Sequence, residues 1–334
     1  MLHDVLRTLR QRPYQILITT HWAPDGDAIG SSLGWAHYLR ALGHQVTVLL
    51  PNAPSKSLQL SMGYSASFVR IAEDSPNLVE ELFNHAEIHF ALDYNSPSRV
   101  GMALEPLVRA FAGRQVLIDH HQQPDPLFVE AYSDTLKSST SEMIADVIVA
   151  DEGWSRVDQA CADNLLMGII TDSGSFRYPS TSAQTLYTAA RLMEVGAEPS
   201  VIHERLFDSS SLSRVQTMAC GLQSMQIIAN GNAALMSLSS ADLEGAGYVS
   251  GDSEGLVNWG LSVDGVRVSV LLREDASGLV KMSFRSKGDH DVNEFARSHY
   301  AGGGHRNAAG GASKLPLDTL RAELVLKLTE WLAH

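Results

Sequence analysis

The sequence predicts an α/β protein with a parallel-sheet N-terminal domain, a helical connector and a smaller α/β C-terminal domain. Apolar, strand-like runs alternate with helical patterns through the first half of the 334 residues. A helical pattern then extends from residue 184 to residue 228, and strand-like runs return after it. Fully apolar strands that alternate with helices are typical of a parallel sheet covered on both faces. We therefore expect domains at 1–190 and 229–334, joined by a connector at 191–228.

Four strand-like runs and one helical run define the first domain. The strand patterns cover 14–21, 45–51, 86–95 and 114–121, and the helical pattern covers 28–43. The long apolar stretch 139–153 continues the alternation. Three strand patterns end in acids or histidines: "ILITTHWAPDGD", "IHFALD" and "QVLIDHH". Because ligands gather at the carboxyl ends of parallel strands, the sequence predicts a functional site at that edge of the sheet.

The second half of the chain is predicted to contain the connector and a second α/β unit. Helical patterns cover 182–196, 201–207 and 211–228, and strand patterns cover 233–239, 266–275 and 279–288. The last two strand patterns are joined by "DASG", which is typical of a hairpin turn. A helix over 292–300, a glycine-rich loop over 301–311 and a final helix over 317–334 complete this unit.

Composition limits the classes of function. The net charge of −13 argues against wrapping long nucleic acid, which requires many lysine and arginine contacts to phosphates. No apolar run approaches the roughly 20 residues that span a bilayer, and the N-terminus lacks a signal-peptide pattern. We therefore expect a cytoplasmic protein that does not bind membranes. The two cysteines, Cys161 and Cys220, cannot form a disulfide framework and lack the spacing of a zinc site.

Acids and histidines gather in a few short stretches of the chain. These are "HWAPDGD", "ALDYNSPSR", "IDHHQQP" and "GIITDSGSFRYPST", followed by the glycine-rich "AGGGHRNAAGG". Each stretch alone can be explained as a helix cap, a turn or a polar strand end. Together, these explanations would require acids and histidines to occur by chance at the ends of four separate helices or strands. Carboxylates and imidazoles without thiolates suit Mn²⁺ especially, with Mg²⁺, Co²⁺ or Fe²⁺ as alternatives. Six such ligands suffice for two ions that share a carboxylate, and such pairs activate water and clamp phosphoryl groups.

In this order, "HWAPDGDAIGS", "ALD", "DHH", "TDSG" and "GGGHRNAAGG" resemble the motifs of the DHH phosphoesterase superfamily with its associated C-terminal domain. The resemblance covers nearly the whole chain. Length and layout are most similar to the bacterial nanoRNase group, which are bifunctional oligoribonucleases that also act as phosphatases on 3′-phosphoadenosine 5′-phosphate (pAp). The resemblance implies an active site in the cleft between the two domains.

The family pattern assigns roles to the matching residues of the first domain. It implies six ligands for two ions: His21 and Asp25 on the first, Asp27, His120 and Asp172 on the second, and Asp93 as the bridge. Asp119 is then a residue that orients the site, and His121 faces the scissile phosphate. Spacing alone leaves either histidine of the pair open as the ligand, and only the family analogy selects His120.

The family pattern also implies substrate contacts, most of them in the second domain. The glycines of "GGGH", Gly303 and Gly304 among them, bring backbone amides close to an anion, and His305 adds a polar side chain. Arg285 and its neighbour Ser286, from "FRS", resemble the nucleotide-contacting part of the family, where a guanidinium stacks on a base or binds phosphate. Arg99 is a weaker candidate, since pairing with a carboxylate explains it equally well.

The resemblance implies a metal-dependent phosphoesterase that releases 5′-mononucleotides from short RNA and dephosphorylates pAp-like nucleotides. The main alternative is a phosphodiesterase for linear or cyclic dinucleotides such as pApA or cyclic di-AMP. An inorganic pyrophosphatase or an exopolyphosphatase ranks below it, and a non-catalytic nucleotide sensor would show missing ligands. The expected partners are short RNA or small phosphorylated nucleotides, with no long nucleic acid and no membrane. A homodimer is compatible with the sequence.

Overall fold

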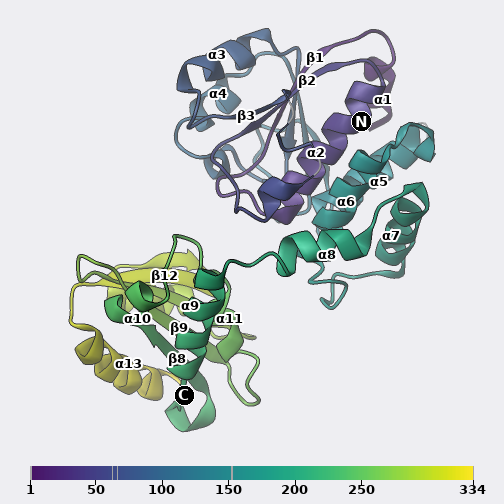
Figure 1. Ribbon diagram of the computed structural model, residues 1–334. Helices are drawn as coiled ribbons and strands as arrows, with labels where there is room; N and C mark the ends of the chain where they lie inside the picture. The colour runs from purple at the N-terminus through teal and green to yellow at the C-terminus, as the bar shows by residue number, and fades with distance from the viewer. Residues whose placement is uncertain (1, 62, 66, 152, 334) are drawn as a thin grey trace. The chain divides into compact units, whose positions relative to one another are not determined.

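The chain divides into two compact units, Met1–Ser209 and Ser210–His334. The computed structural model describes residues 2–61, 63–65, 67–151 and 153–333 (Figure 1). The division falls inside the expected connector 191–228, so the helices of that stretch are shared between the two units. Over the described residues, no helix has the length and apolar character needed to cross a membrane.

The first unit contains the expected parallel sheet, which has six strands in the order β3-β2-β1-β4-β5-β6. The strands are β1 (Gln15–Thr19), β2 (Gln45–Leu50), β3 (Val69–Ile71), β4 (Ile88–Leu92), β5 (Arg114–Asp119) and β6 (Glu130–Ser133). The prediction missed β3 and β6, which are short, partly exposed edge strands without an apolar run. The strand order reverses between β1 and β4, and ligands of such sheets bind outside the carboxyl ends of the strands at this point.

Helices cover both faces of this sheet. They are α1 (Leu2–Leu9), α2 (Gly26–Ala41), α3 (Pro76–His85), α4 (Glu105–Ala110), α5 (Thr140–Asp151), α6 (Gln159–Asp172), α7 (Ala183–Val195) and α8 (Pro199–Phe207). Ile16 and Ile18 of β1 face the core that α2, α5 and α6 share, whereas Leu17 faces the core under α3 and α4. Short 3₁₀ turns occur at η1 (Leu58–Leu60), η2 (Pro97–Val100) and η3 (Gly153–Arg156).

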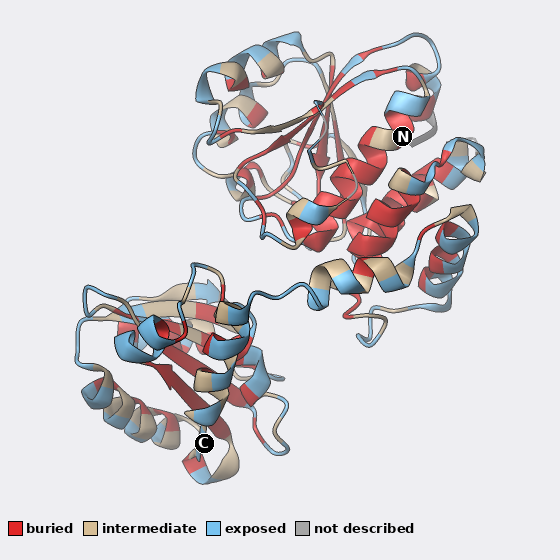
Figure 2. Cartoon of the chain, in the orientation of Figure 1, coloured by how far each residue is buried: buried red, intermediate tan, exposed pale blue. Residues whose placement is uncertain are grey.

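Helices α2 and α6 pack so closely that only glycine fits at their contact. A Cβ atom at Gly30 would lie 2.5 Å from the carbonyl oxygen of Asn164, which is backbone and cannot move aside. A Cβ atom at Gly168 would collide with the Ser141 side chain and lie 2.7 Å from Asp27 Oδ1. Figure 2 shows α2, α5 and α6 as largely buried. These three helices therefore form the rigid support of the residues at their ends.

The second unit is a mixed sheet between helices, with the strand order β11-β12-β10-β9-β8-β7. Its strands are β7 (Gln226–Ile228), β8 (Ala233–Leu238), β9 (Val268–Glu274), β10 (Val280–Ser286), β11 (Gly303–His305) and β12 (Ala308–Ser313). Its helices are α9 (Leu212–Gln223), α10 (Ser240–Gly245), α11 (Leu256–Gly260), α12 (Val292–Tyr300) and α13 (Leu317–Trp331), with the 3₁₀ turn η4 (Ala229–Gly231). Helices α12 and α13 pack on one face, and α10 and α11 on the other.

Two predictions for this unit are wrong. The expected loop 301–311 contains the hairpin of β11 and β12, because β12 pairs with β10 despite its alanine and glycine sequence. The helix expected over 211–228 ends at Gln223, and the residues after it form β7. The hairpin of β9 and β10 and the helix over 292–300 are confirmed.

Candidate metal centre

The six residues expected to bind metal converge at the carboxyl end of the first sheet, next to the point where its strand order reverses. His21 follows β1, Asp93 follows β4 and His120 follows β5. Asp25 and Asp27 lie at the start of α2, and Asp172 ends α6. Their ligand atoms form two groups that could each hold an ion, namely His21 with Asp25 and Asp93, and Asp27 with His120 and Asp172.

Asp93 lies between the two groups. Its Oδ2 is 3.5 Å from His21 Nε2, and its Oδ1 is 3.6 Å from His120 Nε2. Thr140 Oγ1 donates a hydrogen bond of 2.9 Å to Oδ1 of this buried carboxylate. The backbone of Asp93 is left-handed, with φ of 64°, a conformation that costs an L-residue about 1–2 kcal/mol. A strained residue of this kind persists only where its surroundings hold it, and the side chain is thereby directed to both groups.

The first group is formed by the loop after β1. His21 Nδ1 donates to the Trp22 carbonyl oxygen at 2.9 Å, which leaves Nε2 facing Asp25 Oδ1 at 3.7 Å. Asp25 is the N-cap of α2, where its Oδ1 accepts hydrogen bonds from the amides of Asp27 and Ala28. Burial raises the pKa of Asp25, but the hydrogen bond and charge of His21, together with the backbone hydrogen bonds from Ala28 and Asp27, outweigh it, so the pKa is lowered overall.

The second group surrounds a fully buried carboxylate. Asp27 Oδ2 accepts from Thr140 N at 2.6 Å, and Oδ1 accepts from Ser141 N at 2.9 Å, both at the N-terminus of α5. His120 Nε2 lies 3.2 Å from Asp172 Oδ2 and 3.9 Å from Asp27 Oδ2. Burial and repulsion from Asp93 and Asp172 raise the pKa of Asp27 well above its ordinary value. The three carboxylates are therefore costly to keep ionised together unless a cation joins them.

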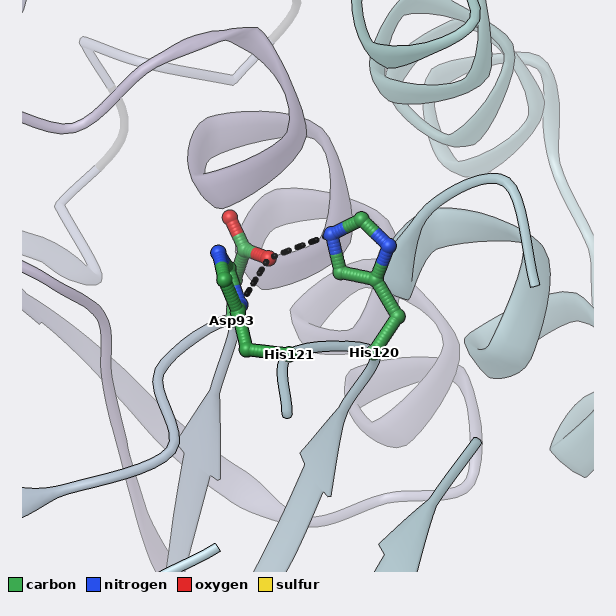
Figure 3. Close-up of side chains that lie close together, drawn as sticks. All are labelled: Asp93, His120 and His121. Carbon is green, nitrogen blue, oxygen red and sulfur yellow. Dashed lines mark ion pairs between the residues drawn. The ribbon is translucent and has the colours of Figure 1, made fainter. Parts of the chain in front are cut away.

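Both neighbouring histidines, His120 and His121, face Asp93 (Figure 3), but their other partners differ. His121 Nδ1 lies 2.6 Å from Asp119 Oδ1, and Asp119 is fully buried at the end of β5. His121 also lies 3.8 Å from Asp93 Oδ1, so it borders the centre. Asp93, His120 and His121 also lie close enough together to hold an ion, but of the two histidines only His120 faces Asp27 and Asp172.

The donor set fits divalent ions. Ligand atoms that lie about 2.1 Å from one ion at right angles are separated by about 3 Å, close to the spacings within both groups. His21 Nδ1 donates to the Trp22 carbonyl oxygen and His120 Nδ1 donates to the Lys137 carbonyl oxygen at 3.4 Å. Such hydrogen bonds leave Nε2 of each histidine free to face a metal. Among the ion pairs of the described residues, none joins these carboxylates to a lysine or an arginine.

Metal binding at this centre should depend on pH. Burial lowers the pKa of both His21 and His120, but the neighbouring carboxylates outweigh it and raise each pKa to about 10. Both imidazoles are thus protonated at neutral pH until a metal ion displaces the protons. We expect the apparent Mn²⁺ affinity to rise as pH increases from 6.5 to about 10, with proton release in titration calorimetry. The same result is expected with His85→Gln, an exposed histidine of α3, and a pH-independent affinity would contradict this assignment.

The predicted substrate residues of the second unit lie on β10 and β11. Arg285 is partly buried, and its Nη1 donates to the Phe284 carbonyl oxygen at 2.9 Å. Ser286 Oγ donates to His290 O at 2.6 Å and accepts from Asn307 Nδ2 at 2.9 Å, so its hydroxyl supports a loop. Gly303 and Gly304 belong to β11, and Gly304 has φ of 150°. The His305 side chain lies outside the described part of the structure.

Arg99 is located in the first unit, beside the metal centre. Its carbonyl oxygen accepts from the amide of Trp22 at 2.6 Å, next to His21. Within the described residues its guanidinium forms no ion pair, which argues against the reading of Arg99 as a simple partner of a carboxylate.

The sequence reasoning missed the residues that support the centre from α5. Thr140 and Ser141 hold Asp27 through their amides, and Thr140 also holds Asp93. The Ser139 side chain accepts from the amide of Glu142, as in the first turn of a capped helix. The pattern "STSE" before an apolar run is a capping-box signal that predicts such a helix start.

Comparisons with known proteins agree with this architecture. Residues 15–169 match the DHH family N-terminal domain, and residues 232–333 match the DHHA1 domain. The bifunctional oligoribonuclease and PAP phosphatase NrnA of Thermus thermophilus is 34% identical over 308 residues, which are 91% of this chain and 86% of that protein. The cyclic-di-AMP phosphodiesterase PdeA of Listeria monocytogenes is 23% identical over 92% of this chain but 46% of its own length.

A solved structure is similar along the whole chain. The crystal structure of an exopolyphosphatase-related protein from Bacteroides fragilis is 31% identical, with a TM-score of 0.90. The match covers 100% of this chain and 98% of that one. The chain is therefore similar along most of its length to proteins with several names: an oligoribonuclease and PAP phosphatase, a cyclic-di-AMP phosphodiesterase and an exopolyphosphatase-related protein.

Proposed function

We propose that this chain, which belongs to the DHH phosphoesterase family and carries a C-terminal DHHA1 domain, hydrolyses short oligoribonucleotides to 5′-mononucleotides and dephosphorylates pAp-like nucleotides. The observation that carries the proposal is the position of Asp93, with one carboxylate oxygen facing each of two histidine and carboxylate groups. Nearly full-length similarity to NrnA proteins supports the choice of substrate.

In this proposal His21 and Asp25 would hold the first ion, Asp27, His120 and Asp172 would hold the second, and Asp93 would contribute to both. Two bound Mn²⁺ ions would supply an activated water and positive charge for the phosphoryl oxygens. The chain itself holds the ligands in place: α5 fixes Asp27, and Thr140 fixes Asp93. Because these ligand side chains are already held in place, they need little rearrangement when metal and substrate bind, and such preorganisation favours catalysis.

His121 is proposed to give a proton to the leaving oxygen. Its Nδ1 faces the buried Asp119 carboxylate at 2.6 Å, which leaves Nε2 directed away from Asp119. A third of the His121 side chain is exposed, so a substrate has access to it. Asp119 orients the ring and is a positioning residue in this scheme.

The alternative substrates remain separable by experiment. A linear or cyclic dinucleotide phosphodiesterase is the second candidate, because PdeA of Listeria monocytogenes matches over 92% of this chain. Its similarity covers less than half of that protein, whereas the NrnA of Bacillus subtilis is 27% identical over 89% of this chain and 88% of its own length. The higher identity to NrnA proteins, 34% for that of Thermus thermophilus against 23% for PdeA, favours the oligoribonuclease.

A substrate panel tests the proposal. Purified protein with Mn²⁺ is incubated with pAp, pApA, a five-nucleotide RNA, cyclic di-AMP, pyrophosphate and polyphosphate, and products are separated by chromatography. We expect the largest kcat/KM for pApA, short RNA and pAp, with 5′-mononucleotides as products of the RNA. A preference for cyclic di-AMP, pyrophosphate or polyphosphate over every linear nucleotide would replace the proposed function.

The identity of the metal gives a further prediction. After chelation, Mn²⁺ should restore activity on short RNA better than Ca²⁺, with Mg²⁺ and Co²⁺ between them. Ca²⁺ prefers six to eight oxygen ligands at longer distances, and the two imidazoles suit it poorly. Initial rates across a titration of each metal measure the order. Equal rates with Ca²⁺, or full activity in excess chelator, would contradict the assigned centre.

A further inference from the structure

A basic groove crosses the sheet of the second unit, on the face where α11 packs. Its volume is about 480 Å³, and it lies over β9, β10 and β12. Arg273, Lys281 and Arg285 line it, and the floor on the β12 side consists of Gly310, Gly311 and Ala312. A floor without long side chains lets a ligand approach the backbone. The groove therefore combines space with concentrated positive charge in a chain whose net charge is −13.

Two of these cations are placed directly opposite each other. Arg273 of β9 pairs in register with Lys281 of β10, so both side chains leave the same face of the sheet. Like charges in this position destabilise a sheet unless an anion lies between or above them. Hydrogen bonds from Ser277 lower the pKa of Asp275, and the charge of Lys281 contributes a smaller lowering. Among the described residues, no cation of the groove forms an ion pair with a carboxylate.

Both ends of the groove have partly fixed side chains. The Arg273 guanidinium lies over the ring of Tyr248, 5.2 Å from its centroid. Arg285 is anchored by its hydrogen bond to the Phe284 carbonyl oxygen. Lys281 and Arg285 are four residues apart on β10, which corresponds to about 13 Å along a strand. This length is several times the rise of about 3.4 Å between stacked nucleotides of one strand.

We propose that this groove is a subsite for the part of a single-stranded RNA beyond a dinucleotide, with Arg273 and Lys281 holding a backbone phosphate. The inference rests on the proposed function and adds that the second unit selects substrates by length. Arg285 remains the contact for the nucleotide nearer the glycine hairpin. A phosphate would form charge-assisted hydrogen bonds to both opposed cations, for which the described residues supply no carboxylate in an ion pair.

The lining of the groove favours RNA over an inorganic polyanion. Val257, Leu271 and Leu279 line it beside the cations. The first two are only 4% exposed, and the partly exposed Leu279 can contact a ribose or a base. Polyphosphate has no apolar part to place against Leu279. Glu254 also lines the groove and would repel a ligand with charge along its whole length more than one with spaced phosphates. A volume of about 480 Å³ suits a small ligand or a short single strand, not a double helix.

Binding measurements with the full chain test the subsite. Fluorescence anisotropy in chelator, where cleavage is blocked, compares a labelled five-nucleotide RNA with labelled pApA. We expect the wild-type protein to bind the pentamer at least 10-fold more tightly, and Arg273→Gln/Lys281→Gln to lose most of this difference. Loss of this phosphate contact should also reduce the slope of log affinity against log salt by about 0.7, the contribution of one neutralised single-strand phosphate.

A matched double variant controls for charge and stability. Arg321→Gln/Lys327→Gln removes the same charge from α13, which packs on the opposite face of the sheet. It should keep the wild-type slope, and thermal unfolding of both variants checks that they fold. Wild-type pentamer affinity in Arg273→Gln/Lys281→Gln, or an equal loss on pApA, overturns the subsite. Tighter binding of a polyphosphate of equal charge overturns the choice of RNA.

Cleavage assays separate this inference from the proposed function. If the wild-type protein cleaves the pentamer with Mn²⁺ but the groove variant binds it normally, the function stands and the subsite is wrong. If the wild-type protein cleaves no linear nucleotide yet the groove variant loses length-dependent binding, the subsite stands and the proposed activity is wrong.

Discussion

The Asp93→Asn variant should lose activity on short RNA by about 1,000-fold or more. The bridging carboxylate faces both candidate ion sites, and an amide carries no charge to hold two cations together. Loss of the metal pair removes several kcal/mol of charge stabilisation, and each 1.36 kcal/mol corresponds to a tenfold change in rate. Single-turnover rates at saturating Mn²⁺ measure the effect.

The fold of this variant should survive. Residue 93 has φ of 64°, a conformation that asparagine tolerates better than most residues, and the amide oxygen can still accept from Thr140. Asp208→Asn, at an exposed position of the same unit, is the matched control and should retain wild-type activity. Near-normal turnover of a folded, metal-saturated Asp93→Asn protein would rule out the bridged two-ion centre.

The sequence was sufficient to predict the strands that carry the site, because β1, β2, β4 and β5 are continuous apolar runs buried on both faces. Such runs have few alternatives to a parallel sheet. The edge strands β3 and β6 form through pairing with a neighbour, and their residues are only partly buried. Strand β12 shows the same limit, since its glycines and alanines have low strand propensity and its pairing with β10 decides the structure.

The choice between His120 and His121 shows where local sequence stops being informative. Adjacent residues that follow a strand differ in direction, and the sequence does not state which side chain turns toward Asp172. That direction depends on the position of α6, whose end supplies Asp172, and on the close packing of α6 against α2 at Gly30. The support of Asp27 by the amides of α5 depends likewise on helices distant in the sequence. The ligand types were therefore predictable, but their arrangement required the packed core.

The second large effect concerns the pair formed by Asp119 and His121, which should act on proton transfer and not on metal binding. Asp119→Asn should reduce kcat on short RNA by roughly 100- to 10,000-fold, the range for loss of a positioned general acid, while Mn²⁺ affinity measured by calorimetry stays within about twofold of wild type. The decisive measurement compares substrates with different leaving groups.

A nucleoside 5′-phosphate p-nitrophenyl ester releases a stable anion that needs no proton, so the rate of its hydrolysis should fall much less than the rate of RNA hydrolysis. His121→Ala should show the same selectivity, and combining the two changes should add little, because both remove one function. If both substrates slow equally, or if Mn²⁺ affinity falls with the rate, Asp119 supports the metal centre itself and His121 is not the proton donor.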